Sequence, residues 1–168
     1  MTDSREVAAH LLACCDAVYH RVGRSAPSLT DDAYCVRAYE FARSMGESAL
    51  ELGDYVGERR RSPLRVIDTV LEHAVLADET GAMLLYALAT AVGPRLLVSL
   101  RDARELLGID DDARRMFDGV SATVVREILL VGEVARSRDP IDDPTWQAAA
   151  RDLTLTLDDA GFAESFGF

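Results

Sequence analysis

Apolar residues recur every three or four positions along two long segments, and this spacing restricts the fold more than any other feature of the sequence. In the segment Asp31 to Arg60 the recurring positions are Tyr34, Ala38, Phe41, Met45, Leu52 and Val56. In the segment Asp111 to Arg138 they are Phe117, Val120, Val124, Ile128, Val131 and Ala135. Such spacing places apolar side chains on one face of a helix, and that face must be buried. Both segments therefore predict long amphipathic helices that share a core.

Residues that begin or end helices divide the rest of the chain into further helical segments. The predicted ranges are Ser4 to Val22, Pro63 to Val92 (with a break near Asp78 as an alternative), a segment ending at Leu107, and Pro144 to Asp159. The pair Gly93-Pro94 is expected to end the helix that begins at Pro63. Because short connections between long helices imply antiparallel neighbours, we predict an all-α antiparallel helical bundle of five to seven helices. Residues 1–160 would form this single domain, and residues 161–168 a tail.

Charge and cysteine content restrict the partners and the compartment. With 29 acidic and 18 basic residues, the net charge of −11 argues against binding to nucleic acid or to an anionic membrane. The longest apolar run, Gly81 to Val92, is too short to span a bilayer, and the N-terminus lacks the positive start of a signal peptide. The three cysteines have neither zinc nor redox spacing. We therefore expect a cytoplasmic protein.

The sequence offers no strong catalytic motif. All 18 basic residues are Arg, so chemistry that needs a Schiff-base lysine, a pyridoxal-phosphate anchor or a phosphate-loop lysine is excluded. No serine lies in a Gly-x-Ser-x-Gly turn. His10 and Cys14 are four residues apart, but two ligands do not make a metal site. His73 is expected to be exposed, and Cys14 and Cys15 to be buried, unreactive thiols.

Four acids on the first long helix, Glu40, Glu47, Glu51 and Asp54, form an aligned stripe. At about 100° per residue the stripe is roughly 60° wide and lies roughly 140° from the centre of the apolar face. A metal site inside a bundle needs inward-pointing carboxylates. We therefore interpret the stripe as a solvated helix face.

A metal-dependent enzyme is the alternative hypothesis. Asp68, Glu72 and Glu79 align on the edge of the apolar face of the next helix. A Mg²⁺ site for phosphorylated small molecules would take its ligands from both helices, namely Glu51, Asp54, Glu72 and Glu79. The all-α nucleotide pyrophosphohydrolases use such acids, but they place Glu-x-x-Glu before Glu-x-x-Asp. Here Glu51-x-x-Asp54 comes first, and Ala82 stands where the second motif needs an acid, so we infer no family relationship.

The C-terminal segment GFAESFGF contains Phe162, Phe166 and Phe168, three of the five phenylalanines of the chain. These side chains would either fold back over the bundle or insert into a partner, where aromatic anchors dominate interface energies. A third hypothesis is a ligand-sensing pocket lined by Met45, Met83, Tyr86, Phe117 and Trp146.

The sequence favours a non-enzymatic interaction or regulatory protein that acts through helix faces and the aromatic tail and needs no cofactor. A homodimer is expected, because helices of such length are long for so small a domain.

Overall fold

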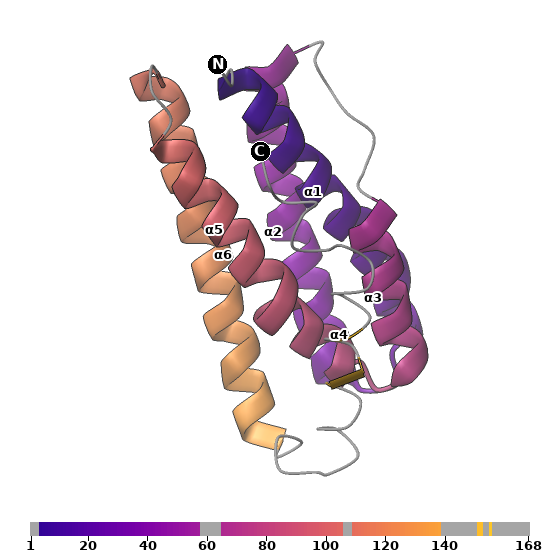
Figure 1. Cartoon of the computed structure of the whole chain (residues 1–168). Coiled ribbons are helices and arrows are strands. Elements are labelled where there is room, and N and C mark those ends of the chain that lie inside the picture. Colours follow the sequence, from indigo (N-terminus) through magenta and orange to yellow (C-terminus); the bar gives the residue numbers. More distant parts are fainter. Residues whose placement is uncertain (1–3, 58–64, 106–108, 139–150, 153–154, 156–168) are drawn as a thin grey trace.

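The computed structural model describes residues 4–57, 65–105, 109–138, 151–152 and 155. Within these residues the chain is all-α, contains no strand, and packs five helices into one body (Figure 1). Four of them are α1 (Ser4–Ser25), α2 (Asp32–Val56), α3 (Arg65–Ala77) and α6 (Asp111–Arg138). The fifth runs without interruption from Ala82 to Arg104 and comprises α4 (Ala82–Ala87), a π-helical turn (Leu88–Val92) and α5 (Gly93–Arg104). The predicted all-α helical bundle is confirmed.

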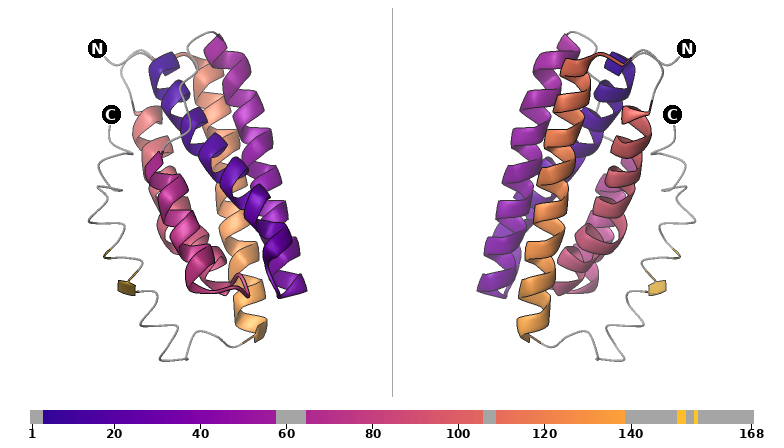
Figure 2. Two further views of the ribbon diagram at one scale, coloured as in Figure 1. Left: turned by 90° about the vertical axis from the view of Figure 1, so that its right-hand side faces the viewer. Right: turned by 90° about the vertical axis from the view of Figure 1, so that its left-hand side faces the viewer.

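The helices enclose one hydrophobic core. Successive helices run in alternating directions (Figures 1 and 2). Helix α2 packs between α1 and α6, α5 packs along α6, and α3 closes the bundle against α1 and α4. The largest fully buried side chains come from every one of these helices and include Leu11, Phe41, Ile67, Leu84 and Phe117. The apolar face that the sequence predicts for each long helix points into this core.

Local signals explain where the long helices begin and end. The side chain of Asp31 accepts hydrogen bonds from the backbone N–H groups of Ala33 and Tyr34, at 3.0 and 3.1 Å, and so caps the first turn of α2. At the other end, Gly57 has a φ of 63°, a backbone conformation that glycine adopts readily. Asp110 caps α6 by accepting a hydrogen bond from the N–H of Ala113. Each cap satisfies backbone groups that a helix end leaves without partners.

The prediction that a helix ends at Gly93-Pro94 is wrong. The helix continues through both residues, because the turn before them widens to π geometry, with the Gly93 N–H bonded to the Leu88 carbonyl five residues back. A proline ring clashes with the carbonyl four residues back in a regular α-helix, and π turns occur inside α-helices as single irregular turns of the kind seen here. Gly93 itself faces α6 closely, since an added Cβ would lie 2.7 Å from Ile128 Cδ1.

This continuous helix, 23 residues long, is long and apolar enough to cross a membrane by length and composition. The helix extends beyond the apolar run Gly81 to Val92 that is too short to span a bilayer. In the structure, 56% of the most apolar window of the helix is buried inside the bundle, as in the core helix of a globular protein.

Candidate functional site

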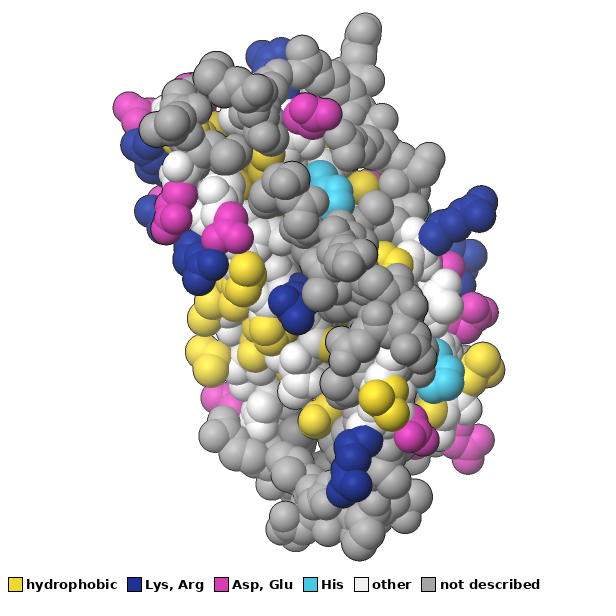
Figure 3. Space-filling view, in the orientation of Figure 1, with side chains coloured by type: hydrophobic (Ala, Val, Ile, Leu, Met, Phe, Trp, Pro, Cys, Tyr) yellow, Lys and Arg dark blue, Asp and Glu magenta, His cyan; other side chains and the backbone are white. Residues whose placement is uncertain are grey.

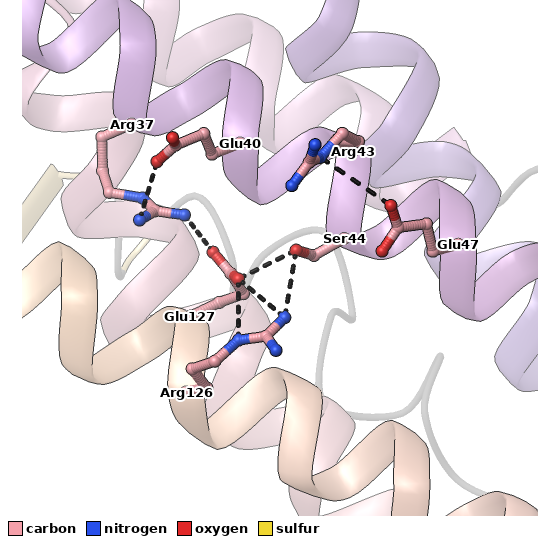
Figure 4. A network of polar contacts seen from close by, with 7 residues as sticks. All are labelled: Arg37, Glu40, Arg43, Ser44, Glu47, Arg126 and Glu127. Atoms are coloured by element: carbon pink, nitrogen blue, oxygen red, sulfur yellow. Dashed lines mark hydrogen bonds and ion pairs between the residues drawn. The ribbon is translucent and has the colours of Figure 1, made fainter.

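A buried ion pair joins α2 to α6. Glu127 on α6 is 2% exposed and Arg37 on α2 is 7% exposed. Arg37 Nη2 donates a hydrogen bond to Glu127 Oε2, and Ser44 Oγ donates to Glu127 Oε1 over 2.8 Å (Figure 4). A buried carboxylate without partners would be strongly unfavourable. The pairing therefore fixes how α2 and α6 are rotated against each other.

Two half-exposed side chains extend this network to the surface. Arg126 approaches Glu127 Oε1 with Nε at 3.4 Å and Nη2 at 3.3 Å, and Arg37 Nη1 lies 3.0 Å from Glu40 Oε2 (Figure 4). Charged groups of alternating sign thus run from Arg126 at the surface through the buried Glu127 and Arg37 to Glu40, which is again at the surface. We name this set, Arg37, Glu40, Ser44, Arg126 and Glu127, the α2–α6 network.

The sequence analysis did not identify this network, although a signal for it exists. Arg37 lies three residues after Tyr34 and four before Phe41, so it falls within the apolar series of α2. Glu127 lies three residues after Val124 and four before Val131, in the same kind of position. One charge of each sign on core faces of two helices predicts a buried pair, because neither charge is stable there alone.

The outer face of α2 carries a second series with three-and-four spacing, formed by Val36, Tyr39, Arg43, Gly46 and Leu50. Its side chains point away from the core. Val36 is 57% exposed, Tyr39 59% and Leu50 66%. We call these five residues the outer stripe. Apolar and aromatic side chains repeated in this way on a solvent face are typical of a helix that docks against another helix.

Two surface hollows flank the outer stripe along the seam between α1 and α2. One, of about 280 Å³, lies beside Leu50, and the other, of about 300 Å³, lies beside Tyr39. Tyr19 of α1 lines both hollows and separates them. Its ring packs on Gly46, where an added Cβ would lie 2.8 Å from Tyr19 Cδ2. The absent side chain of Gly46 therefore allows a close approach of α1 to α2 at this point.

The two hollows differ in charge. The described residues that line the hollow beside Tyr39 include His20, Arg24 and Arg43 and no acid. The hollow beside Leu50 is lined by Asp16 and Glu47, and by Arg43 from its edge. Arg43 Nε lies 3.8 Å from Glu47 Oε1 in the middle of the face (Figure 4). The seam thus has a basic end and an acidic end.

The four acids predicted as an exposed stripe, Glu40, Glu47, Glu51 and Asp54, are all exposed, as expected. The four ligands of the Mg²⁺ hypothesis are not gathered. Glu51 and Asp54 lie on α2, whereas Glu72 and Glu79 lie on and after α3, which packs mainly against α1 and α4. Among the described residues no group of three or more His, Cys, Asp or Glu side chains could hold a metal ion.

Glu72 and its neighbour Asp68 bind an arginine of α1. Arg21 donates to both oxygens of Asp68, from Nε at 2.8 Å and from Nη2 at 2.7 Å, and Arg21 Nη1 donates to Glu72 at 3.3 Å. These hydrogen bonds from the guanidinium lower the pKa of the Asp68 carboxyl below its ordinary value. The acidic edge of α3 therefore ties α3 to α1.

The described residues of the hypothetical ligand pocket belong to the hydrophobic core or pack against it. Met45, Met83 and Phe117 are fully buried in the hydrophobic cluster, and Tyr86 packs against it half-buried. Neither of the two hollows described above is lined by any of these residues. Trp146, like Phe162, Phe166 and Phe168, lies outside the described residues.

The predictions for Cys14, Cys15 and His73 are confirmed. Both thiols are buried and His73 is exposed. Burial raises the pKa of the Cys15 thiol to about 12 and that of Cys14 well above its ordinary value. Since the thiolate is the reactive form, neither cysteine is suited to nucleophilic chemistry.

A second group of exposed apolar side chains lies over α5 and α6, where Figure 3 shows hydrophobic atoms gathered. Its largest exposed members are Val98, Val125 and Leu129, the last 60% exposed. Neither hollow adjoins this group.

Comparisons of the chain with protein-family models, with curated proteins and with solved structures find no match. The geometry of the α1–α2 face and of the α2–α6 network is therefore the basis for the function proposed below.

Proposed function

We propose that this protein is a non-enzymatic interaction protein of the cytoplasm whose α1–α2 face binds a helix of a protein partner. The observation that carries the proposal is the outer stripe, in which three exposed apolar side chains, Val36, Tyr39 and Leu50, lie on one face of α2 beside two hollows. Amphipathic helices bind such faces by inserting side chains at the same three-and-four spacing. The C-terminal phenylalanines are proposed as a second contact, on the sequence argument alone.

The rigidity of the face supports this role. Arg37 and Ser44 on the inner side of α2 bind Glu127, so the helix that carries the outer stripe is held against α6 by buried polar contacts. On its other side the helix is in close contact with Tyr19 of α1. A surface held in its binding conformation loses less conformational entropy when a partner binds.

Charge defines the partner's chemistry. The basic end of the seam, at Arg24 and Arg43, fits acidic side chains, and the acidic end, at Asp16 and Glu47, fits basic ones. Between them Tyr19 and Leu50 provide apolar contact. The partner is therefore expected to be an amphipathic helix with apolar anchors and opposite charges at its two ends, and such complementarity favours one binding direction.

A photocrosslinking experiment tests this proposal. The photoreactive amino acid p-benzoylphenylalanine replaces Tyr39 in the full chain, expressed in cells of its source organism, and the adduct is mapped by mass spectrometry. The control position is Leu76 on α3, which is 81% exposed and distant in sequence from both hollows. We expect an adduct at position 39 that maps to a helix of one protein. The additional change Leu50→Arg is expected to abolish this adduct.

Two results would overturn the proposal. One is the absence of any adduct at position 39 in cells where the protein is present at its normal level. The other is the same set of adducts at positions 39 and 76, which would show random contact rather than a binding face.

A further inference from the structure

The outer stripe together with the adjacent Glu47 is complementary to itself, in charge and apolar side chains, when its direction is reversed. Tyr39 lies at one end and Leu50 at the other, and Arg43 and Glu47 lie between them, one helical turn apart. The described part of the chain leaves all four side chains largely exposed. An interface about a two-fold axis requires this property, because residue i of one copy meets residue j of the other, and j meets i.

We infer that the partner bound by the α1–α2 face is a second copy of this chain. The two copies would pack through this same face, in antiparallel orientation, about a two-fold axis at the level of residues 44 and 45. The inference rests on the proposed function and identifies its partner. In this arrangement Tyr39 faces Leu50 of the second copy. Arg43 lies next to Glu47 of the second copy, and both of these side chains are largely exposed.

Helix α1 adds a second pair of opposite charges. Asp16 lies in the hollow at the Leu50 end of the seam, and Arg24 lies in the hollow at the Tyr39 end. Reversing the direction of the seam brings Asp16 toward Arg24 of the second copy. By symmetry, each of these charge pairs occurs twice across the interface.

A parallel arrangement does not have this complementarity. It would place Arg43 against Arg43 and Glu47 against Glu47 of the second copy, and like charges in contact are unfavourable. Each copy also carries a net charge of −11, which opposes association at long range. Local pairing of opposite charges is therefore what selects the antiparallel arrangement.

Native mass spectrometry and light scattering of the full chain measure the oligomeric state. We expect a dimer for the wild-type protein and a monomer for Leu50→Arg. The matched control is Leu129→Arg, which places the same charge at a leucine of similar exposure on α6. The control is expected to remain a dimer, which would separate the outer stripe from the apolar group over α5 and α6.

Charge exchange tests the register. Arg43→Glu leaves two acids at positions 43 and 47, and Glu47→Arg leaves two bases, so each variant alone is expected to dissociate with a dissociation constant raised about tenfold or more. An equal mixture of the two variants is expected to form a heterodimer, identified by its mass. The double variant, with both changes in one chain, is expected to recover the wild-type dimer. Circular dichroism checks that each variant is folded.

The outcomes distinguish this inference from the proposed function. A monomeric wild-type protein whose position 39 crosslinks to a different protein overturns the homodimer and leaves the proposed function intact. A dimer that survives Leu50→Arg but dissociates with Leu129→Arg moves the interface to α5 and α6 and overturns the inference. Failure of the mixed variants to form a heterodimer overturns the antiparallel register.

Discussion

Replacing Glu127 with alanine removes the carboxylate at the centre of the α2–α6 network. In the folded protein Arg37, Ser44 and Arg126 donate hydrogen bonds to this carboxylate. Among the described residues, its loss leaves the buried Arg37 guanidinium with one carboxylate, that of the half-exposed Glu40, 3.0 Å from Nη1. The variant is expected to fold less stably because a buried charge has lost its main partner.

The size of the effect follows from the burial of both partners. Breaking a buried ion pair by removing one member destabilises a protein by about 3–5 kcal/mol. Because Glu40 still compensates part of the charge on Arg37, we expect the lower end of this range, about 3 kcal/mol. For a chain of this size each kcal/mol lowers the midpoint of thermal unfolding by about 2–4 °C, so the expected decrease is about 6–12 °C.

Thermal and urea unfolding followed by circular dichroism measure this change. Glu133→Ala is the matched control, because Glu133 is an exposed glutamate on the same helix, and its removal is expected to change stability by less than about 0.5 kcal/mol. The double change Arg37→Met with Glu127→Leu replaces the pair by apolar side chains of similar size. Such replacements are often neutral or stabilising, so the double variant is expected to be at least as stable as the wild type.

Either of two results would refute the reasoning. If Glu127→Ala is as stable as Glu133→Ala, the carboxylate is not a buried partner of Arg37. If the apolar double variant is as unstable as Glu127→Ala, the loss comes from altered packing between α2 and α6 and not from an unpaired charge.

Three further predictions concern other parts of the bundle. Gly93→Ala is expected to destabilise the protein by about 1–3 kcal/mol, since the new Cβ would lie 2.7 Å from a side chain of α6 and 2.9 Å from a backbone carbonyl. At Gly132 an added Cβ would meet no described atom outside its own stretch of helix within 4 Å, so Gly132→Ala is expected to stabilise the protein by about 0.5–1 kcal/mol. Equal effects of the two changes in urea unfolding would contradict this contrast. Asp68 has a lowered pKa in the folded state, so its ion pair contributes stability that is fully present above the ordinary carboxyl pKa of 3.8 and is lost as the pH falls through the lower, folded-state value. The stability difference between wild type and Asp68→Asn should therefore be constant near neutral pH and shrink below about pH 3.8, and a difference unchanged at low pH would argue against the pairing. In a thiol titration of the folded protein at pH 8, the half-buried Cys35 is expected to react first. The buried Cys15, with a pKa of about 12, should react only after unfolding. Rapid reaction of all thiols would contradict this expectation and show that the core around α1 opens.

The hydrophobic pattern was sufficient to predict the helices but not the position at which each helix ends. The series through Phe41 and Met45 is buried, as is the series through Phe117 and Val124, because a helix with one apolar face has few alternatives to burying it. Pro94 was misinterpreted, because the sequence rule treats proline as the end of a helix. The structure shows that a π turn before Gly93 lets the helix continue. Local propensity is a weak guide where the helix packs closely against a neighbour, as it does at Gly93 against Ile128 of α6.

The sequence by itself determined the all-α class, the exposed acidic face of α2 and the buried, unreactive state of Cys14 and Cys15, since each depends on residues close together on one helix. Only the tertiary structure decided which helices are neighbours. It paired Arg37 with Glu127, which is 90 positions further along the sequence, bound Asp68 and Glu72 to Arg21, and placed Tyr19 over Gly46 to form the seam beside the outer stripe. Contacts between helices depend on how they rotate and slide against each other, and that arrangement is set by packing of the whole core and not by the pattern of any single helix.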